Sequence, residues 1–595
     1  MKALFFSPFS NIWEHSFPEA LIAEGLVEQG VEVLAVRCGG MLDAHCVAMS
    51  AAGVGARDSL TTKKQVCRAC MKRRDLLDQA MPFPEVVMDE FVTAADRSEA
   101  DSACATASPD SWTGLMIDGV PLGRYAAYEF LLNYKLVGTN IPPALWPLYL
   151  DQLRNAIIVF RVAQRMIAEH KPTRVIVFNR LYSVNHAFCA AADQAGVPTY
   201  TLQGGGHITR RAETMTMYRG AQSLAEVFQT EAWKKYQSKP IGEGEVSLVG
   251  EHFSGLLEGS SAFAYSSAFE ASQPETLRAK FSVAHGRTVL LVPLSSEDEI
   301  NAARLADALP ASSGQTSVFE GQFEWIAFLL AFAAQRSDLH FIIRLHPRMF
   351  PNKRDNVQSP VVEQVMRLLE NAPANVSLNL PSDLVSLYDI MQIVDVLLSY
   401  RSSVGAELAA FGIPVVVPAN ADFFTYPEEI NLIGRSPDDY VAKIDQAIAA
   451  GWSIENTRRS FRWFAFLFSR VAVDFSDSVH ARPIAIRPKK PGLRLWVWRK
   501  LVYIFIQFGP LIRERIALRN RKFPVSSQQL FLDVLAHDRG SLAESRLWPE
   551  VVSSMTRETN LLTQYLDGLS TTLWKEISTP TSLAGRVRRH LPPSN

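Results

Sequence analysis

Short apolar runs alternate with helix-like stretches in two separate parts of this 595-residue chain. In the first part, an apolar run at Ala3–Ser7 precedes a helical pattern at Phe17–Gln29 and a second run at Glu32–Arg37. A crossover of that length joins parallel strands, so this pattern indicates a β-α-β unit. Two further strands are expected at Arg174–Phe178 and Thr199–Leu202. The N-terminal half is therefore predicted to form an α/β layer structure.

A second α/β series begins near residue 283. Apolar runs separated by helical patterns predict its strands at Thr288–Pro293, His340–Leu345, Val376–Leu378, Val396–Ser399 and Pro414–Pro418. Such alternation is typical of a parallel sheet with helices on both faces. Two lobes of this kind give a two-lobed architecture with a cleft. Because ligands bind at the carboxyl ends of parallel strands, we expect the chemistry in the loops that follow strands.

The chain length is enough for several domains. The predicted segments are an N-terminal Rossmann-like lobe at 1–270 with an insertion at about 38–120, a C-terminal Rossmann-like lobe at 283–452, a crossover helix at 453–480, a basic aromatic segment at 487–524 and a helical tail at 525–595.

Composition excludes several classes of protein. Lys and Arg number 60 against 61 acids, and a nucleic-acid-binding chain is usually more basic, so no nucleic-acid partner is expected. Six cysteines are too few for a disulfide scaffold in a chain of this length. No apolar run approaches the twenty or so residues of a membrane span. The apolar run at the N-terminus is too short for the hydrophobic region of a secretory signal. We therefore expect a cytoplasmic protein.

Two polar motifs follow predicted strands of the second lobe. In RLHPR, His346 comes directly after the strand and Pro347 ends it. In SYRSSVGAELAAFGIPVV, Ser402 and Ser403 stand where a helix begins, and Ser402 is suited to cap it. Free backbone N–H groups and two hydroxyls at a helix N-terminus favour a phosphate. Glu407, one turn further, is placed to accept ribose hydroxyls. Each motif alone is common in α/β proteins, but the pair favours a functional site.

These motifs and the two-lobed layout resemble bacterial capsule and surface-polysaccharide glycosyltransferases of the GT-B fold, among them Kdo transferases and sialyltransferases. The likeness covers roughly residues 1–475. It implies that His346 contacts the donor phosphate, that Ser402 and Ser403 hold phosphate oxygens, and that Glu407 lies near the nucleotide ribose. The implied donor is a CMP-, CDP-, UDP- or GDP-linked sugar.

The run FNRLYSVNHAFCAAADQAGVPTYTLQGGG also resembles a stretch of capsule biosynthesis proteins. It supplies the candidate acceptor-side residues, which are Asn179, Arg180, Gln203, Gly204 and Gly205. The sequence departs from that pattern at Arg180, where glycine is frequent, and at Gln203, where an acid is common. Arg401 also precedes the serines where a small residue is usual. The glycines would allow close approach of a ligand, or form a plain flexible turn.

Sugar transfer requires a group that stabilises the departing phosphate. No D-x-D motif stands out, so we expect a metal-independent reaction. The role of a metal ion would then fall to the helix terminus together with His346, Arg344 and Arg348.

The reaction also needs a carboxylate or imidazole near the acceptor hydroxyl. Glu297 and Asp298 are the favoured candidates because their loop, SSEDE, follows the strand Thr288–Pro293 and would face the cleft. The same letters fit an acid-rich first turn of a serine-capped helix equally well. His15, in the loop after the first strand, is the competing base.

Four cysteines cluster in the basic insertion. Cys38, Cys46, Cys67 and Cys70 form the pattern C-x7-C-x20-C-x2-C. In a reducing cytoplasm such a group indicates tetrahedral zinc, and four thiolates with no open position would make the metal structural. An iron–sulfur cluster and unligated thiols remain alternatives.

The segment between Arg482 and Lys522 carries twelve Lys or Arg residues and one acid, with aromatic residues interleaved. This composition is typical of an element that lies in the interface of an anionic membrane, although it also fits a helix packed on the protein's own surface. A lipid-linked acceptor would explain a peripheral location at the inner face of the cytoplasmic membrane.

Three functional hypotheses follow. The leading one is a glycosyltransferase that moves a sugar from a nucleotide donor to a growing surface polysaccharide or a lipid-linked acceptor. The second is a UDP-sugar 2-epimerase, which shares the two-lobed fold but usually has a much shorter chain. The third is a non-catalytic protein of polysaccharide assembly.

Overall fold

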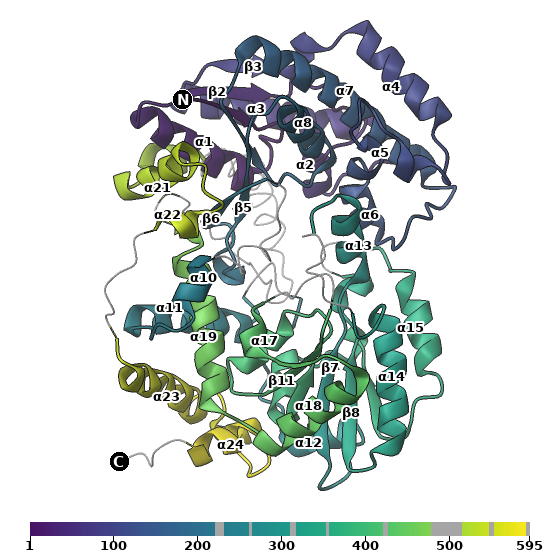
Figure 1. The fold of residues 1–595 in the computed structure, drawn as a ribbon, viewed down its shortest axis with the longest axis vertical. Helices are drawn as coiled ribbons and strands as arrows, with labels where there is room; N and C mark the ends of the chain where they lie inside the picture. Colours follow the sequence, from purple (N-terminus) through teal and green to yellow (C-terminus); the bar gives the residue numbers. More distant parts are fainter. Residues whose placement is uncertain are drawn as a thin grey trace, which may run out of the picture.

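Two α/β lobes stand one above the other in the computed structural model (Figure 1). The structure describes the chain apart from residues 221–230, 261–264, 310–316, 353–355, 421–425, 477, 479–513, 547–552 and 591–595. Each lobe is built on its own sheet of mainly parallel strands with helices packed on it. The predicted fold class, two Rossmann-like lobes, is confirmed.

The N-terminal lobe contains a seven-stranded sheet in the order β13-β6-β5-β4-β1-β2-β3. Its strands are β1 (Lys2–Phe6), β2 (Glu32–Arg37), β3 (Glu85–Val87), β4 (Arg174–Phe178), β5 (Thr199–Gly204), β6 (Thr214–Arg219) and β13 (Ala472–Asp474). The first five run parallel, whereas β6 is antiparallel to β5 and to β13.

Successive side chains of β1 enter two different cores, because neighbouring residues of a strand face opposite sides of the sheet. Leu4 and Phe6 pack into the core that holds α7 (Trp146–His170) and α8 (Ser183–Gln194). Ala3 and Phe5 pack into the core that holds α1. Both faces are covered, which explains why the strands are apolar throughout rather than alternating. Helix α1 spans Trp13–Glu28.

The stretch between β2 and α7, which includes the predicted insertion, is mainly helical apart from β3. Its helices are α2 (Val47–Ala51), α3 (Leu60–Ala80), α4 (Ala94–Thr106), α5 (Leu122–Tyr125) and α6 (Tyr128–Tyr134). Helix α4 begins with a capping box, in which the Thr93 hydroxyl and the Asp96 carboxylate each accept a backbone N–H of the other residue.

The C-terminal lobe contains a six-stranded sheet, all parallel, in the order β12-β11-β10-β7-β8-β9. Its strands are β7 (Thr288–Pro293), β8 (Leu339–Arg344), β9 (Val376–Asn379), β10 (Val396–Leu398), β11 (Val415–Pro418) and β12 (Leu432–Gly434). The helices between them are α13 (Glu297–Leu305), α14 (Gln322–Gln335), α15 (Val361–Leu369), α16 (Leu387–Ile390), α17 (Val404–Ala409) and α18 (Pro437–Ala450).

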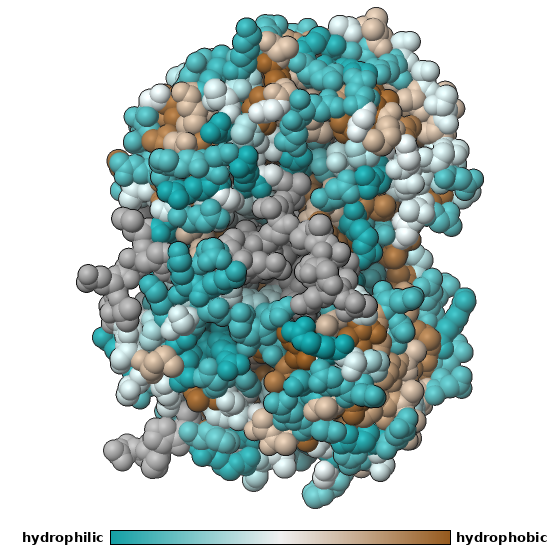
Figure 2. All heavy atoms as spheres, viewed as in Figure 1, coloured by the Kyte–Doolittle hydropathy of each residue, from teal (hydrophilic) through white to brown (hydrophobic). Residues whose placement is uncertain are grey.

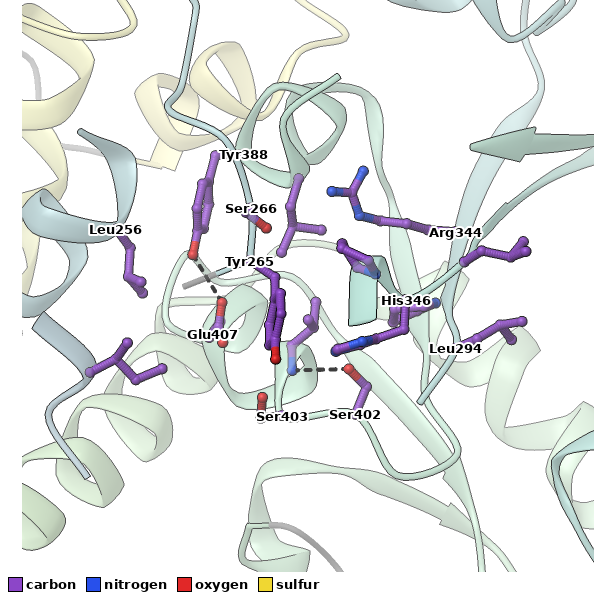
Figure 3. A pocket seen from close by; sticks show the side chains of 16 residues that line it. Leu256, Tyr265, Ser266, Leu294, Arg344, His346, Tyr388, Ser402, Ser403 and Glu407 are labelled. Atoms are coloured by element: carbon purple, nitrogen blue, oxygen red, sulfur yellow. Dashed lines mark hydrogen bonds between the residues drawn. The ribbon is translucent and has the colours of Figure 1, made fainter. Parts of the chain in front are cut away.

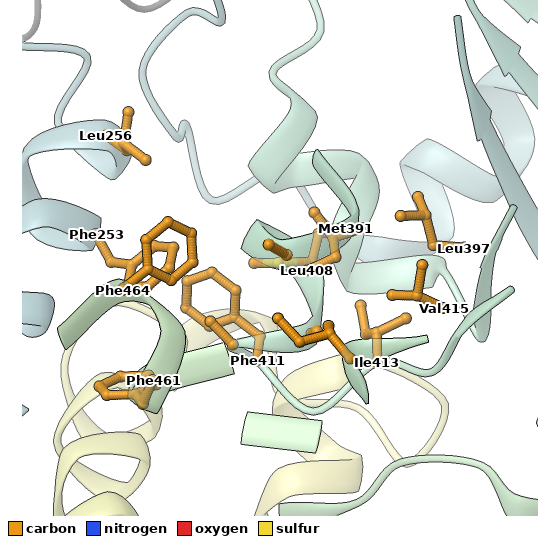
Figure 4. Packing of buried hydrophobic residues seen from close by; sticks show 14 of the residues in the cluster. Phe253, Leu256, Met391, Leu397, Leu408, Phe411, Ile413, Val415, Phe461 and Phe464 are labelled. Carbon is orange, nitrogen blue, oxygen red and sulfur yellow. The ribbon is translucent and has the colours of Figure 1, made fainter. Parts of the chain in front are cut away.

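The chain leaves the N-terminal lobe before residue 270. Helix α10 (Glu231–Tyr236) and helix α11 (Glu243–Leu257) share one hydrophobic core with the C-terminal sheet. The Phe253 ring lies 5.1 Å from that of Phe411 and 5.2 Å from that of Phe464 (Figure 4). The predicted boundary therefore shifts, because the apolar face of α11 is buried on the second lobe. Helix α12 (Pro274–Lys280) follows.

The chain returns to the first lobe through helix α19 (Ile454–Ser469), which ends just before β13. Helices α21 (Val525–Ala536) and α22 (Leu542–Ser545) then pack on the N-terminal lobe, while α23 (Met555–Thr571) and α24 (Leu583–His590) pack on the C-terminal side. In Figure 1 this yellow-green tail follows one side of the molecule along both lobes.

Hydrophilic side chains dominate both lobes on the face shown in Figure 2. In the part of the chain that the structure describes, no helix combines the length and the apolar character needed to cross a bilayer. Residues 487–513 of the predicted membrane-interface segment lie outside the described residues, so that assignment stays a prediction.

Candidate functional site

A cavity of about 130 Å³ lies at the carboxyl ends of the C-terminal strands (Figure 3). The loops after β7, β8 and β10 and the start of α17 form one side of it, and Ile208, in the loop after β5, reaches it from the first lobe. Six of the seven residues predicted on the donor side line it, namely Arg344, His346, Pro347, Ser402, Ser403 and Glu407. The seventh, Arg348, is not among the lining residues.

His346 is a neutral hydrogen-bond donor. Burial, together with the cations of Arg348, Arg344 and Lys135, lowers the pKa of His346 to about 4. Its Nδ1 atom accepts the backbone N–H of Arg348 at 3.1 Å. In a neutral ring the proton must then be on Nε2. The imidazole is therefore set to donate one hydrogen bond to an anionic oxygen.

Arg344 supplies a buried positive charge beside this ring. It is the last residue of β8, and its Nη1 atom donates to Asn379 and, at 3.1 Å, to the carbonyl of Val385. Burial lowers the pKa of Arg344 to about 10, which leaves the guanidinium charged at neutral pH. The two hydrogen bonds fix the plane of the group, so it faces the cavity in one orientation.

The two serines lie at the start of α17, but the helix begins one residue later than predicted. Ser403, not Ser402, is the N-cap residue, and its hydroxyl makes no capping hydrogen bond. The Ser402 hydroxyl accepts the backbone N–H of Val404 at 3.4 Å, and its own N–H donates to Ser399 Oγ at 3.1 Å. Since Ser403 Oγ is not used to cap the helix, it is available to a ligand in the cavity.

Glu407 lies deeper in the cavity and is paired with a tyrosine. The Tyr388 hydroxyl donates to Glu407 Oε2 at 3.0 Å (Figure 3). Burial raises the pKa of Glu407 above its usual range, and the hydrogen bond from Tyr388 opposes that shift. One carboxyl oxygen remains for a second donor, such as a ribose hydroxyl.

The lining thus combines one cation, one neutral imidazole donor, three serine and two tyrosine hydroxyls, and a single carboxyl whose charge burial disfavours. Such a set is complementary to a phosphate, and it stabilises negative charge that develops on a leaving phosphate oxygen.

Arg348 turns away from the cavity towards α13. Its Nη2 atom lies 2.7 Å from Asp298 Oδ2 and its Nε atom 3.5 Å from Glu299 Oε1. The same Nη2 atom donates to the carbonyl of Leu132 in α6 at 3.0 Å, across the gap between the lobes. Arg348 is therefore better described as an interlobe link than as a donor ligand.

The candidate bases are engaged elsewhere. Asp298 is 2% exposed, and it accepts from both Arg348 and the Ser296 hydroxyl, so it is better described as the partner of that arginine than as a free general base. Glu297 lies 3.7 Å from Arg401 in a second ion pair. Their SSEDE loop forms the first turn of α13, as the structural alternative for these letters anticipated.

His15 stacks on Phe178 with the two ring centroids 3.7 Å apart. Burial lowers the pKa of His15 to about 3, with a smaller contribution from Arg211, so the ring is neutral. His15 is not among the residues that line the donor cavity.

The acceptor-side candidates of the first lobe serve its own structure. Arg180 is 6% exposed, and its guanidinium pairs with Asp193 at 2.5 Å and donates to the Thr199 hydroxyl. Asn179 has a φ of 55°, and its side-chain oxygen accepts the Leu181 N–H at 3.1 Å. The fold thus turns Arg180 inward, which explains why an arginine is tolerated at that position.

The glycine run is needed for packing. Gln203 accepts the Tyr218 hydroxyl at 3.0 Å. A Cβ atom at Gly205 would lie 2.3 Å from Thr214 Oγ1, and one at Gly204 would lie 2.9 Å from the carbonyl oxygen of Arg211. The close approach expected at these glycines is therefore to the protein's own chain.

Sequence reasoning missed Lys135, which connects the first lobe to the loop after His346. Lys135 follows α6 in a left-handed conformation, with φ of 50°, and is fully buried. Its ammonium donates to the carbonyls of Phe350, at 3.0 Å, and Val357. A lone lysine in a helical stretch carries no sequence signal for such a role.

Tyr265 and Tyr388 were also missed. Both line the cavity, and the Tyr265 ring meets that of His346 edge-on, with centroids 5.4 Å apart (Figure 3). Neither belongs to a recognisable motif. Tyr265 falls within residues 1–270, which sequence alone assigned to the N-terminal lobe.

All four clustered cysteines line one smaller cavity of the first lobe. Each is a free, half-buried thiol. In the part of the chain that the structure describes, no three Cys, His, Asp or Glu side chains are grouped closely enough to hold a metal ion.

Comparisons with known proteins give no match by sequence and only low similarity by structure. No protein-family model matches the sequence, and no curated protein does. Among solved structures, the chain is similar to UDP-GlcNAc 2-epimerase from Neisseria meningitidis bound to UDP-GlcNAc, at 12% identity over 78% of this chain and 94% of the other, with a TM-score of 0.22. It is also similar to the glycosyltransferase SnogD from Streptomyces nogalater, at 12% identity over 78% and 96%, with a TM-score of 0.24. At values this low, a functional assignment must come from the geometry of the site itself.

Proposed function

We propose that the protein is a metal-independent glycosyltransferase that uses a nucleotide-activated sugar. The observation that carries this proposal is the convergence of His346, Arg344, Ser402, Ser403 and Glu407 on one cavity at the strand ends of the second lobe. These side chains come from two separate segments, the end of β8 with the turn after it and the start of α17, yet their chemistry is complementary to one kind of ligand, a ribose-linked phosphate.

In this proposal each group has a defined task. The Nε2–H of His346 and the guanidinium of Arg344 hold the phosphate oxygens and stabilise the charge that grows as the glycosidic bond to phosphate breaks. The Ser402 and Ser403 hydroxyls fix the phosphate orientation. The free oxygen of Glu407 accepts a ribose hydroxyl, while Tyr388 holds its other oxygen in place.

The proposed acceptor is a surface polysaccharide or a lipid-linked glycan. Support comes from the resemblance of the sequence motifs to capsule transferases and from the basic aromatic composition of 487–524. A UDP-sugar 2-epimerase uses the same type of donor pocket, and it differs in needing no acceptor.

A nucleotide panel tests the donor assignment. We expect CMP, CDP, UDP or GDP to raise the melting temperature of the wild-type protein, since a ligand at a hundred times its Kd contributes about 2.7 kcal/mol to folding stability. His346→Ala should abolish that shift, whereas Gln203→Ala, in the first lobe, should retain it. The absence of a shift with every nucleotide would refute the assignment. Interconversion of the bound sugar without an acceptor would establish the epimerase instead.

A further inference from the structure

A second cavity, lined by thiols, lies in the first lobe. Four of the chain's six cysteines line it, with Pro8 and Phe9 from the loop after β1 and a few apolar side chains. Its free volume of about 20 Å³ is close to that of one water-sized sphere. It therefore suits a single ion rather than an organic ligand.

The four cysteines reach this cavity from three different elements. Cys38 follows β2, and Cys46 is the N-cap residue of α2. Cys67 and Cys70 lie three residues apart in α3, so they share one face of that helix. Long stretches of chain separate these elements, and nothing in the packing of apolar side chains requires a thiol at all four contact points.

One backbone N–H group is directed at a sulfur atom of this cluster. The Gly40 N–H donates to Cys38 Sγ at 3.3 Å. Sulfur accepts hydrogen bonds well only as a thiolate, and amides directed at sulfur are the outer-shell partners that tune thiolate-bound metals.

Burial disfavours the charged thiolate form of these side chains as long as no cation is bound. A divalent ion between the sulfurs would reverse this balance, because a thiol that coordinates a metal is deprotonated. Helix α3 also carries the cations Lys63, Lys64, Arg68, Lys72, Arg73 and Arg74, which would offset the charge of a tetrathiolate.

We propose that Cys38, Cys46, Cys67 and Cys70 bind one Zn²⁺ as a closed, structural tetrathiolate site. Binding releases four protons to solvent, one from each thiol, and leaves a site with a net charge of 2−. The thiols surround the cavity at more than ligand distance, so their side chains must turn inward to close on the ion.

The site would fix the loop that begins at the end of β1. The Cys70 thiol already faces the Pro8 carbonyl, at 4.0 Å, and Arg73 of the same helix donates to Asn11. This loop leads into α1. None of the four cysteines lines the donor cavity, so the zinc site would support the first lobe independently of that cavity.

Zinc content of the full-length protein, purified without chelator, tests the proposal. We expect about one Zn²⁺ per chain, and Co²⁺ substitution should give thiolate-to-metal charge-transfer bands with the d–d bands of a tetrahedral ion. Cys70→Ser should weaken zinc binding at least as much as loss of an outer-shell partner does, about 10- to 100-fold. Cys70→His should retain the ion, because Cys₃His sites also bind zinc, with altered cobalt bands.

Cys189→Ser is the matched control, since Cys189 is buried in α8 and does not line the cavity. It should leave the zinc content unchanged. Zinc should raise the melting temperature of the wild-type protein and of Cys70→His, but not that of Cys70→Ser. Six titratable thiols without metal, disulfides among the four cysteines, or iron with acid-labile sulfide would each overturn the proposal.

Discussion

The two lobes repeat the same strand–loop–helix architecture but use their strand ends differently. After β8 and β10 of the second lobe, polar side chains converge on a cavity. At the ends of β4 and β5 in the first lobe, polar side chains bind other parts of that lobe instead. Arg180 pairs with Asp193, and Gln203 accepts a hydrogen bond from Tyr218. The comparison teaches that the position of a polar residue at a strand end does not define a site. The partners that its atoms already have decide whether it can bind a ligand.

The largest expected effect comes from replacing one polar side chain at a strand end in each lobe. His346→Ala should lower turnover with a nucleotide sugar by about 10²- to 10³-fold, the cost of removing one preorganised donor to a developing oxyanion. Gln203→Ala should change turnover by less than twofold, because its side chain serves Tyr218. Steady-state kinetics on both variants would measure this difference. A larger loss of activity in Gln203→Ala than in His346→Ala would contradict the contrast between the two lobes.

Lys135→Met tests a buried cation that joins the lobes at the donor loop. The change removes the ammonium hydrogen bonds to the Phe350 and Val357 carbonyls, so we expect the free energy of unfolding to fall by about 1–3 kcal/mol. It also removes one of the charges that lower the pKa of His346, which should therefore rise. Denaturant titration and NMR of the imidazole would measure the two effects.

Lys171→Met is the control for that experiment. Lys171 occupies the corresponding left-handed position after α7 but is exposed to solvent. Its replacement should leave both quantities unchanged. Equal losses in the two variants would show that the buried interlobe contacts of Lys135 are unimportant.

Acid should destabilise both lobes through histidines whose pKa burial lowers, and His346 and His15 give one test in each lobe. The pKa of His346 is about 4 in the folded protein against 6.5 for a solvent-exposed ring, so the unfolded chain binds more protons between these limits. The free energy of unfolding should therefore rise with pH across that window and level off above it. For His15 the corresponding pH range extends from about 3 to 6.5. His346→Gln and His15→Gln should each flatten the curve from urea titrations, and an unchanged slope would contradict the burial of that ring.

The smallest effect is expected from two matched tyrosine variants. Tyr388→Phe removes the hydrogen bond to Glu407, and Tyr218→Phe removes the one to Gln203. Each should cost about 1 kcal/mol of folding stability. Only the first should also weaken nucleotide binding, by several-fold, as calorimetric titration would show. Equal nucleotide affinities in the two variants would show that Tyr388 does not contribute to nucleotide binding.

The strands and the donor motifs could be predicted from sequence because they depend on local patterns. The β8 run that precedes His346 and the start of α17 lie within a residue or two of their predicted positions. Their meeting in one cavity follows from the parallel topology, which brings the carboxyl ends of strands to one edge of a sheet.

Other features depend on contacts between distant residues. Arg348 was predicted to bind the donor because it follows His346, yet Asp298, fifty residues earlier, binds its guanidinium. Whether α11 packs on the first or the second lobe is likewise decided by Phe411 and Phe464, which come much later in the chain. No local window of sequence contains both partners of such a pair.

Strand β13 makes the first lobe dependent on the second during synthesis. The β6 edge acquires its partner only when residues 472–474 have emerged, after the whole second lobe has left the ribosome. Until then, nascent chains carry an uncovered sheet edge, the type of surface through which polypeptides join one another. Because the second lobe is encoded before β13, the β6 edge stays without this partner while that lobe is made, and a chain that ends between Arg219 and Ala472 would be released with this edge exposed.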